Sequence, residues 1–189
     1  MPRPDRSRQR LLSTTIRMVR RQGYAATGLQ QVLTTSGASG GSLYHHFPGG
    51  KEELVAAALV TAVERITADL AALLADHDAV TAVGSWLDVY TDAIRRDPRD
   101  GCPVAPVAME AISASPQLTR LARDAFTAWV QLLAARLEID GHTPERAATA
   151  ALTAVSAVEG ALLIGRTQGD GAALVAVRAM LPALLRPDS

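Results

Sequence analysis

The segment 39–42, Ser-Gly-Gly-Ser, combines two features that suit contact with a phosphate backbone. Its first serine is a favourable helix N-cap, and the two glycines leave the first helical turn with almost no side chain. Such a turn lets the helix backbone approach a groove closely, and its N–H groups favour anions. Tyr44, His45 and Lys51 follow with polar tips. Because such groups position a protein on DNA rather than read its bases, the pattern predicts a DNA-binding surface.

Three other patterns in this region would carry different chemistry, and each lacks a necessary part. The run 37–41, Gly-Ala-Ser-Gly-Gly, has the spacing of a nucleophile elbow, but a helix is expected where the elbow needs a strand. His45 and His46 diverge by about 100° on a helix, and no further ligand lies at metal-binding spacing. Lys51 precedes Glu52 rather than the Ser or Thr of a phosphate-binding loop. We therefore expect no catalytic residue, no metal and no cofactor.

Helices must position these residues, because apolar side chains recur at helical spacing along almost the whole chain. The spacing predicts helices over 6–22, 28–35 and 39–46, and a long helix from residue 51 to about residue 75. Further helices are expected up to Pro98, at 106–114, from Pro116, at 144–168 and at 171–185. No run alternates strictly as a half-buried strand would, so the predicted fold class is all-α.

Residues 28–46 satisfy the requirements of a helix-turn-helix. The turn between its two short helices needs a residue that tolerates positive φ, and Gly37 supplies one. Apolar residues are expected to join these helices to the first helix in a small core: Val32, Leu33, Leu43 and Phe47 against Leu12, Ile16 and Val19. We expect a three-helix head over residues 1–50 and a helical body over 51–189.

Charge is divided unevenly along the chain although its formal net charge is zero. Residues 1–51 carry eight basic side chains and one acidic, a net charge of +7, whereas residues 52–189 have a net charge of −7. A basic segment of this kind indicates a nucleic-acid or membrane partner. No apolar run follows the first residues, so a secretory signal is not predicted and we expect a cytoplasmic protein.

Several residues near the N-terminus also fall at a recognisable spacing. They are Gly23-Tyr24, Thr27, Val32, the run Ser-Gly-Ala-Ser at 36–39, the run SLYHHF at 42–47 and Lys51-Glu52-Glu53-Leu54. Together they resemble the N-terminal domain of the TetR family of transcriptional regulators. The run SLYHHFPGGKEEL and the run GCPVA at 101–105 are similar to the LmrA/YxaF-type branch of that family.

The resemblance implies a role at the DNA for seven residues: Thr27, Ser39, Gly41, Ser42, Tyr44, His45 and Lys51. It also implies a C-terminal domain that binds a ligand and forms a dimer. One position departs from the family, because many members have a long side chain where this chain has Gly40. With Gly40 and Gly41 adjacent, Gln30, Ser42 and Tyr44 are the side chains left to read bases.

The predicted body contains few bulky side chains, and these are candidates for a ligand site: Trp86, Tyr90, Met109, Phe126 and Trp129. Each of them suits an ordinary core, but together they offer a lining for an apolar or aromatic ligand, because pockets between bundle helices are mostly hydrophobic. Glu110 is a lone acid in an apolar stretch and either meets a cationic ligand or is exposed. Cys102, the only cysteine, borders the proline-rich loop at 98–106.

The helix expected at 144–168 is unusually poor in charge, with only Glu159 between Arg146 and Arg166. A central acid is costly in a membrane span, so no membrane partner is expected. Small residues recur along it at intervals of three or four: Ala150, Ala154, Ala157, Ala161 and Gly165. They permit close approach of a second helix and suggest a dimer interface, with Glu159 at its edge or paired with Arg166.

The sequence therefore predicts a homodimeric, ligand-responsive repressor without catalytic activity. Its partners would be a double-stranded DNA operator and a small-molecule effector. The alternative is a helical ligand-binding or interaction module that does not bind DNA. Absence of an interaction with DNA, or an interaction that does not weaken with salt, would favour this alternative.

Overall fold

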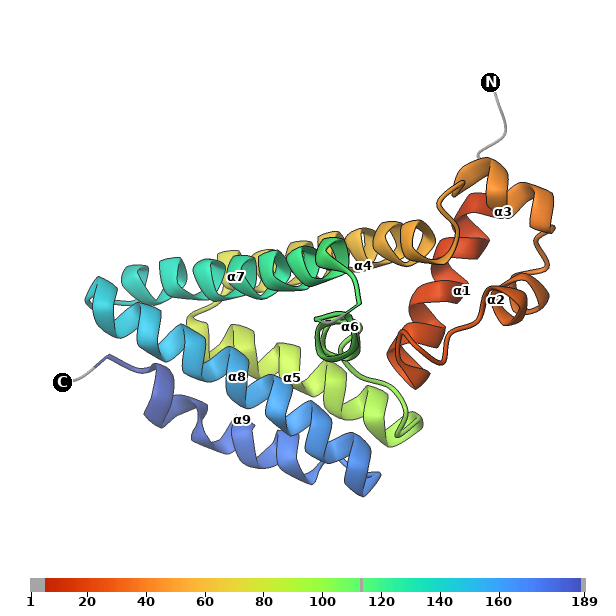
Figure 1. The fold of residues 1–189 in the computed structure, drawn as a ribbon. Coiled ribbons are helices and arrows are strands. Elements are labelled where there is room, and N and C mark those ends of the chain that lie inside the picture. The colour runs from red at the N-terminus through yellow and green to blue at the C-terminus, as the bar shows by residue number, and fades with distance from the viewer. Residues whose placement is uncertain (1–5, 113, 188–189) are drawn as a thin grey trace. The chain divides into compact units, whose positions relative to one another are not determined.

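The computed structural model describes residues 6–112 and 114–187, in which nine helices and no strand occur (Figure 1). The helices are α1 (Arg6–Gln22), α2 (Leu29–Ser36), α3 (Gly40–His46), α4 (Lys51–Asp76), α5 (Ala79–Arg96), α6 (Val104–Ala111), α7 (Pro116–Ile139), α8 (Pro144–Gln168) and α9 (Ala172–Leu185). The all-α prediction is confirmed. The prediction for α6, at 106–114, was two to three residues too late. Pro106 is the third residue of α6 rather than the first, and proline is tolerated there because first-turn N–H groups have no partner in the helix.

The chain divides into two compact units. Unit 1 consists of Met1–Glu64 and Pro103–Arg123, and unit 2 of Arg65–Cys102 and Asp124–Ser189. The expected division at residue 50 does not coincide with these units, because α4 is one continuous helix whose first half belongs to unit 1. In addition, α6 returns to unit 1 from far along the chain.

The core of unit 1 holds the three head helices together. Its buried residues are Leu11, Leu12, Met18, Val32, Leu43, Phe47, Leu54 and Ala58, with Ile16 and Leu33 packed against them. α1 supplies three of these residues, and α3 supplies only Leu43, which is fully buried. A short helix held through one buried side chain keeps most of its surface free for contact with another molecule.

In unit 2, α9 packs against both α5 and α8, and the turn from α8 to α9 brings these last two helices side by side (Figure 1). Gly165 makes this turn possible, because a Cβ at that position would lie 2.8 Å from the Asp170 carbonyl oxygen. By length and composition α8 could cross a membrane, but the core helix of a soluble protein can have the same length and composition, and 44% of the most apolar stretch of α8 is buried within the structure.

The small residues of α8 do not form the surface that we expected. Ala150, Ala154 and Ala161 are at most 3% exposed within the single chain, because this side of α8 faces its own neighbours in unit 2. The prediction that they line a dimer interface was therefore wrong. The outward side of α8 instead carries Leu152 and Leu163, both more than half exposed.

Candidate DNA-binding surface and effector site

The turn between α2 and α3 has the geometry that the sequence predicts. Gly37 ends α2 in the left-handed region, with φ 64° and ψ 24°. Ser39 caps α3, and its hydroxyl accepts a hydrogen bond from the Ser42 N–H at 3.1 Å. The Ser36 hydroxyl accepts a further bond from the Ala38 N–H at 3.3 Å. The turn therefore satisfies its own polar groups and fixes the direction in which α3 leaves it.

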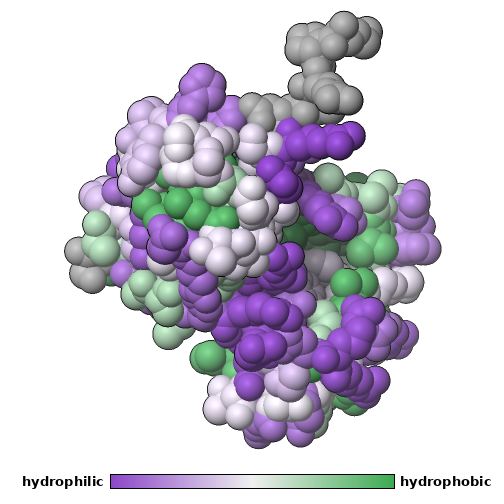
Figure 2. Space-filling model, turned by 90° about the vertical axis from the view of Figure 1, so that its right-hand side faces the viewer, coloured by the Kyte–Doolittle hydropathy of each residue, from purple (hydrophilic) through white to green (hydrophobic). Residues whose placement is uncertain are grey.

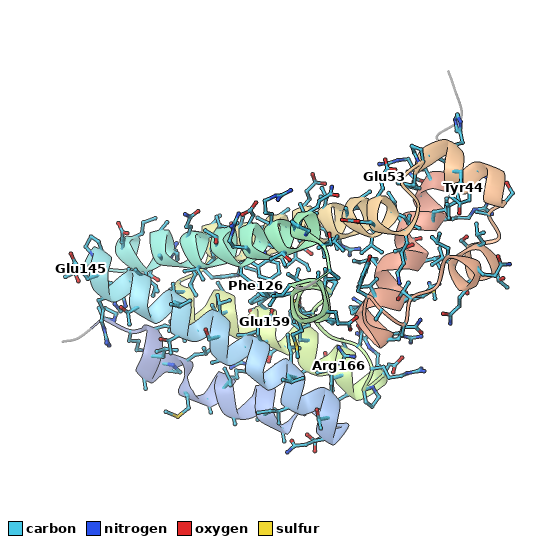
Figure 3. The ribbon with its side chains drawn as sticks, viewed as in Figure 1. Tyr44, Glu53, Phe126, Glu145, Glu159 and Arg166 are labelled. Carbon is cyan, nitrogen blue, oxygen red and sulfur yellow. The ribbon has the colours of Figure 1, made fainter. Side chains whose placement is uncertain are left out.

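The surface of α3 is open at the positions where a contact with DNA was predicted. A Cβ at Gly40 would meet nothing within 4 Å, and one at Gly41 only the Ser39 hydroxyl at 3.9 Å. Packing within the head thus does not require glycine at either position. Tyr44 is 57% exposed (labelled in Figure 3), and His45 is also exposed. The backbone of the first turn and the side chains of the second turn are accessible on the same short helix.

Two predicted contact residues lie outside α3 and differ in their surroundings. Gln30, on α2, is exposed. Thr27 is only 1% exposed, and its hydroxyl donates a 2.7 Å hydrogen bond to the Gly23 carbonyl. The Thr27 side chain therefore closes the turn between α1 and α2, and a direct contact between it and DNA rests on the family resemblance alone.

Lys51 holds the same turn from the start of α4. Its ammonium donates a 3.1 Å hydrogen bond to the Ala25 carbonyl and lies 4.5 Å from the centre of the Tyr24 ring. Partial burial lowers the pKa of Lys51, while the charge of Glu110 acts in the opposite direction. Lys51 thus stabilises the α1–α2 turn through its ammonium group, and it would make its predicted contact with phosphate while it holds this hydrogen bond.

Glu110, on α6, reaches the α1–α2 turn from the other side. Its carboxylate accepts a 2.5 Å hydrogen bond from the Ala25 N–H. A Cβ at Gly23, whose φ is +85°, would collide with the same carboxylate. We call this arrangement of Gly23, Ala25, Lys51 and Glu110 the turn clamp. The sequence analysis assigned Glu110 to a ligand site, but the structure places it in unit 1 with the head.

Exposed arginines lie along α1 of the head. Arg6, Arg8, Arg10 and Arg17 on α1 are all exposed, and the Arg8 guanidinium also lies 5.7 Å from the centre of the Phe47 ring. The face drawn in Figure 2 carries mostly hydrophilic and neutral side chains, with apolar ones in smaller areas. A basic surface of this kind is suited to the phosphates of a nucleic acid.

In unit 2, four of the predicted ligand residues form a continuous chain of aromatic rings. The ring centres of Tyr90 and Trp86 are 5.6 Å apart, those of Trp86 and Trp129 6.1 Å, and those of Trp129 and Phe126 5.5 Å. Each pair meets edge to face, a favourable arrangement for aromatic rings. We call these four residues the aromatic cluster.

The aromatic cluster has a fixed centre and more accessible ends. Trp129 is fully buried and Trp86 is 6% exposed, whereas Tyr90 and Phe126 are partly exposed. The indole N–H of Trp129 donates a 2.9 Å hydrogen bond to the Thr67 hydroxyl on α4. The cluster is thus rigid at its centre, and a ligand would meet first the rings at its two ends.

The other predicted ligand residues have different surroundings. Cys102 is 3% exposed and belongs to unit 2, where its thiol hydrogen-bonds to Glu159. Met109 belongs to unit 1 and is 69% exposed. Glu159 does not pair with Arg166. Burial outweighs the opposite effect of the Cys102 bond and raises the pKa of Glu159 to about 7. Among the residues that the structure describes, no group of three potential metal ligands occurs.

Comparison with known proteins agrees with this arrangement. The model of the tetR family of bacterial regulatory proteins matches residues 11–58, and that of the C-terminal domain of LmrA/YxaF-like transcriptional regulators matches residues 79–180. The HTH-type transcriptional regulator LmrA of Bacillus subtilis is 31% identical over 182 residues, which is 95% of this chain and 97% of LmrA.

Two further proteins are similar to this chain, one in sequence and one in fold. The HTH-type transcriptional regulator YxaF of Bacillus subtilis is 33% identical over 95% of each chain. The crystal structure of a TetR transcriptional regulator from Legionella pneumophila has the same fold, with a TM-score of 0.88 at 23% identity over 98% of this chain and 100% of that one. The protein is therefore a DNA-binding regulator of transcription and not an enzyme, and it belongs to the TetR family of transcriptional regulators.

Proposed function

We propose that this protein is a homodimeric repressor of the cytoplasm that leaves a palindromic operator when a small apolar or aromatic effector binds. The observation that carries the DNA-binding part is the open surface of α3, with its glycine turn and its exposed Tyr44. In this proposal α3 lies in the major groove, with one head on each half-site. Gln30, Ser42 and Tyr44 meet the bases or the adjacent backbone.

The basic groups of the head supply most of the affinity for DNA in this proposal. The exposed arginines of α1 neutralise phosphates, and Lys51 does so from its anchored position. Each phosphate contact releases a counterion, so the affinity falls steeply with salt. The alternative of a module without DNA binding is not supported, because the matched family model covers residues 11–58.

A dimer through the outward sides of α8 and α9 would cover the exposed apolar residues of unit 2. These are Leu152, Leu163 and Ile164 on α8 and Val175 and Met180 on α9, which are 47–64% exposed. In a two-fold interface the same surface of both copies pairs with itself. An apolar strip on two adjacent helices is suited to such a contact, since large exposed apolar areas mark interaction sites.

The effector would bind at the aromatic cluster, whose partly exposed ends offer apolar contacts. A ligand changes the affinity for DNA only if it binds one conformation of the protein more tightly than another. Within unit 1, the hydrogen bond from the Ala25 N–H to the Glu110 carboxylate joins α6 to the head, so a displaced α6 would pull on the α1–α2 turn. The turn clamp is therefore our candidate for the element that responds.

Fluorescence anisotropy with labelled DNA from upstream of the protein's own gene tests this proposal. We expect tight binding at low salt that weakens steeply as salt is added, and release by at least one member of a panel of uncharged and charged aromatic compounds. Sedimentation should show a dimer at micromolar concentration. A monomer would contradict the dimer, and a panel without any effect would contradict the effector but not the DNA binding.

A further inference from the structure

Glu159 is a largely buried acid whose surroundings do not balance its charge. Its neighbours one helical turn away on α8, Val155 and Leu162, are both buried. Its Oε2 atom is buried without any hydrogen-bond partner, and only the Cys102 thiol hydrogen-bonds to the carboxylate. In the described part of the chain, no basic side chain forms an ion pair with it. Burying an uncompensated carboxylate is expensive, so such a group calls for an explanation.

Arg166 is the obvious counterion but is placed elsewhere. It follows Glu159 by seven residues on α8, and its Cδ lies only 3.0 Å from the position of a Cβ at Gly101. The loop that leads into α6 thus covers this side of α8, with Gly101 against Arg166 and Cys102 against Glu159. The carboxylate thus bonds to the Cys102 thiol, and among the described residues no cation contributes to the shift of its pKa.

Glu159 and the aromatic cluster lie at similar positions along the helix axes of unit 2. α5 and α8 run in the same direction (Figure 1), and Ile94 lies 3.4 Å from the position of a Cβ at Gly165. Measured from that contact toward the N-terminus of each helix, Glu159 lies six residues, or about 9 Å, along α8. On α5, Tyr90 and Trp86 lie about 6 Å and about 12 Å from the same contact, so Glu159 falls between them in height. The side chain of Glu159 is drawn in the middle of unit 2 in Figure 3.

Building on the proposed effector site, we infer that Glu159 recognises a protonated amine, so that the effectors of this protein are aromatic amines that bind as cations. The ring of the effector packs on the aromatic cluster, and its ammonium donates hydrogen bonds to the carboxylate. The free Oε2 atom accepts one of them, which gives the buried acid the counterion that the protein lacks. Charge-assisted bonds in a site shielded from water are strong and select against neutral analogues.

A matched pair of probes tests this inference in the full-length protein without DNA. Naphthylmethylamine is a cation at neutral pH, and naphthylmethanol has nearly the same shape but no charge. The chain has two tryptophans, Trp86 and Trp129, and both lie in the aromatic cluster, so their fluorescence reports binding there. At pH 8 we expect the amine to bind at least about tenfold more tightly than the alcohol.

Two variants separate the role of Glu159 from general effects of charge. Glu159→Gln keeps the shape of the side chain and should lose the preference for the amine while it binds the alcohol as before. Glu145→Gln removes an exposed acid from the first turn of the same helix and should leave the preference intact. A thermal melt of each variant, in which Glu159→Gln should be no less stable than the wild type, checks that both fold.

The wild-type protein provides a readout that needs no variant. Glu159 has a pKa of about 7, so its ionised fraction falls between pH 8 and pH 6, and the affinity for the amine should fall with it. The affinity for the alcohol should stay constant. Arg166, two turns along α8, keeps its charge over this range, and the Cys102 thiol that faces the carboxylate from the loop is mostly protonated at the ordinary cysteine pKa of about 8.5.

Equal affinity of the wild type for both probes, absence of amine binding, or a preference that survives in Glu159→Gln would each overturn the inference. These outcomes are distinct from failure of the proposed function. If both probes bind equally and either one releases the operator, the repressor model stands and the inference falls. If the amine is preferred but no amine releases DNA, recognition of the amine by Glu159 stands and the effector-driven release falls.

Discussion

Substitution of Gly23 by alanine tests the turn clamp, and its cost can be divided into two parts. The first is the backbone: Gly23 has φ +85°, and a residue with a Cβ costs about 1–2 kcal/mol in the left-handed region. The second is the collision between that Cβ and the Glu110 carboxylate, which must move and give up its bond from the Ala25 N–H. Because this bond is exposed to solvent, we assign it about 1 kcal/mol.

The two parts predict a specific departure from additivity. In the wild type, Gly23→Ala should lower the free energy of unfolding by about 2–3 kcal/mol, the sum of the backbone cost and the lost bond. In a Glu110→Ala background the bond is already absent, so Gly23→Ala should cost only about 1–2 kcal/mol. The double variant should therefore be about 1 kcal/mol more stable than the sum of the single changes implies.

Urea denaturation followed by circular dichroism measures these four free energies at one fixed protein concentration, because dimer stability depends on concentration. The control replaces Glu110→Ala by Glu145→Ala, an exposed acid on α8, with which Gly23→Ala should be additive. Strict additivity of Gly23→Ala and Glu110→Ala would refute the turn clamp, since neither residue would then sense the other.

Three further outcomes follow from the structure. Ser39→Ala removes the cap of α3 and should cost about 1 kcal/mol of unfolding free energy by urea denaturation, whereas Ser39→Asp should retain most of the stability, and equal losses would contradict a capping role. Asp78 caps α5, and the hydrogen bond that it accepts from the Thr81 N–H lowers its pKa. The difference in free energy of unfolding between wild type and Asp78→Ala should therefore be constant above the ordinary aspartate pKa of about 3.9 and should narrow as the pH falls below it. A difference that does not change with pH would contradict this. Leu163→Glu places a charge on the outward side of α8 and should raise the dimer dissociation constant, measured by sedimentation, at least about tenfold. Val89 on α5 is similarly exposed, and Val89→Glu should leave the dissociation constant unchanged. Similar effects of both variants would argue against the proposed interface.

The positions of the helices could be predicted from the sequence because they depend on local signals. Periodic apolar residues, Gly37 at the end of α2 and Ser39 at the start of α3 act within a few residues of their own position. The four aromatic residues that the structure joins into one cluster were predicted from their bulk. Their grouping follows from the few large side chains that a body rich in alanine can bury.

The turn clamp could not be predicted, because its partners are far apart in the sequence. Glu110 and Ala25 are separated by 85 residues, and nothing local distinguishes this acid from a ligand-binding or exposed one. Helical periodicity also shows that α8 has an apolar side with small residues but not which neighbour it meets. The structure places that side against the protein's own helices, so a second copy would have to use the other side.

The most direct test of the central claim compares wild type and Tyr44→Ala for binding to operator DNA across a range of salt concentrations. Tyr44 is exposed on α3 and its ring makes no contribution to the buried core of the head. We therefore expect the variant to unfold at the same urea concentration as the wild type but to bind the operator at least about tenfold more weakly, equivalent to about 1.4 kcal/mol. Both should lose affinity steeply with salt. Full operator affinity of the variant, or binding that does not respond to salt, would contradict recognition of DNA by α3 and the basic head.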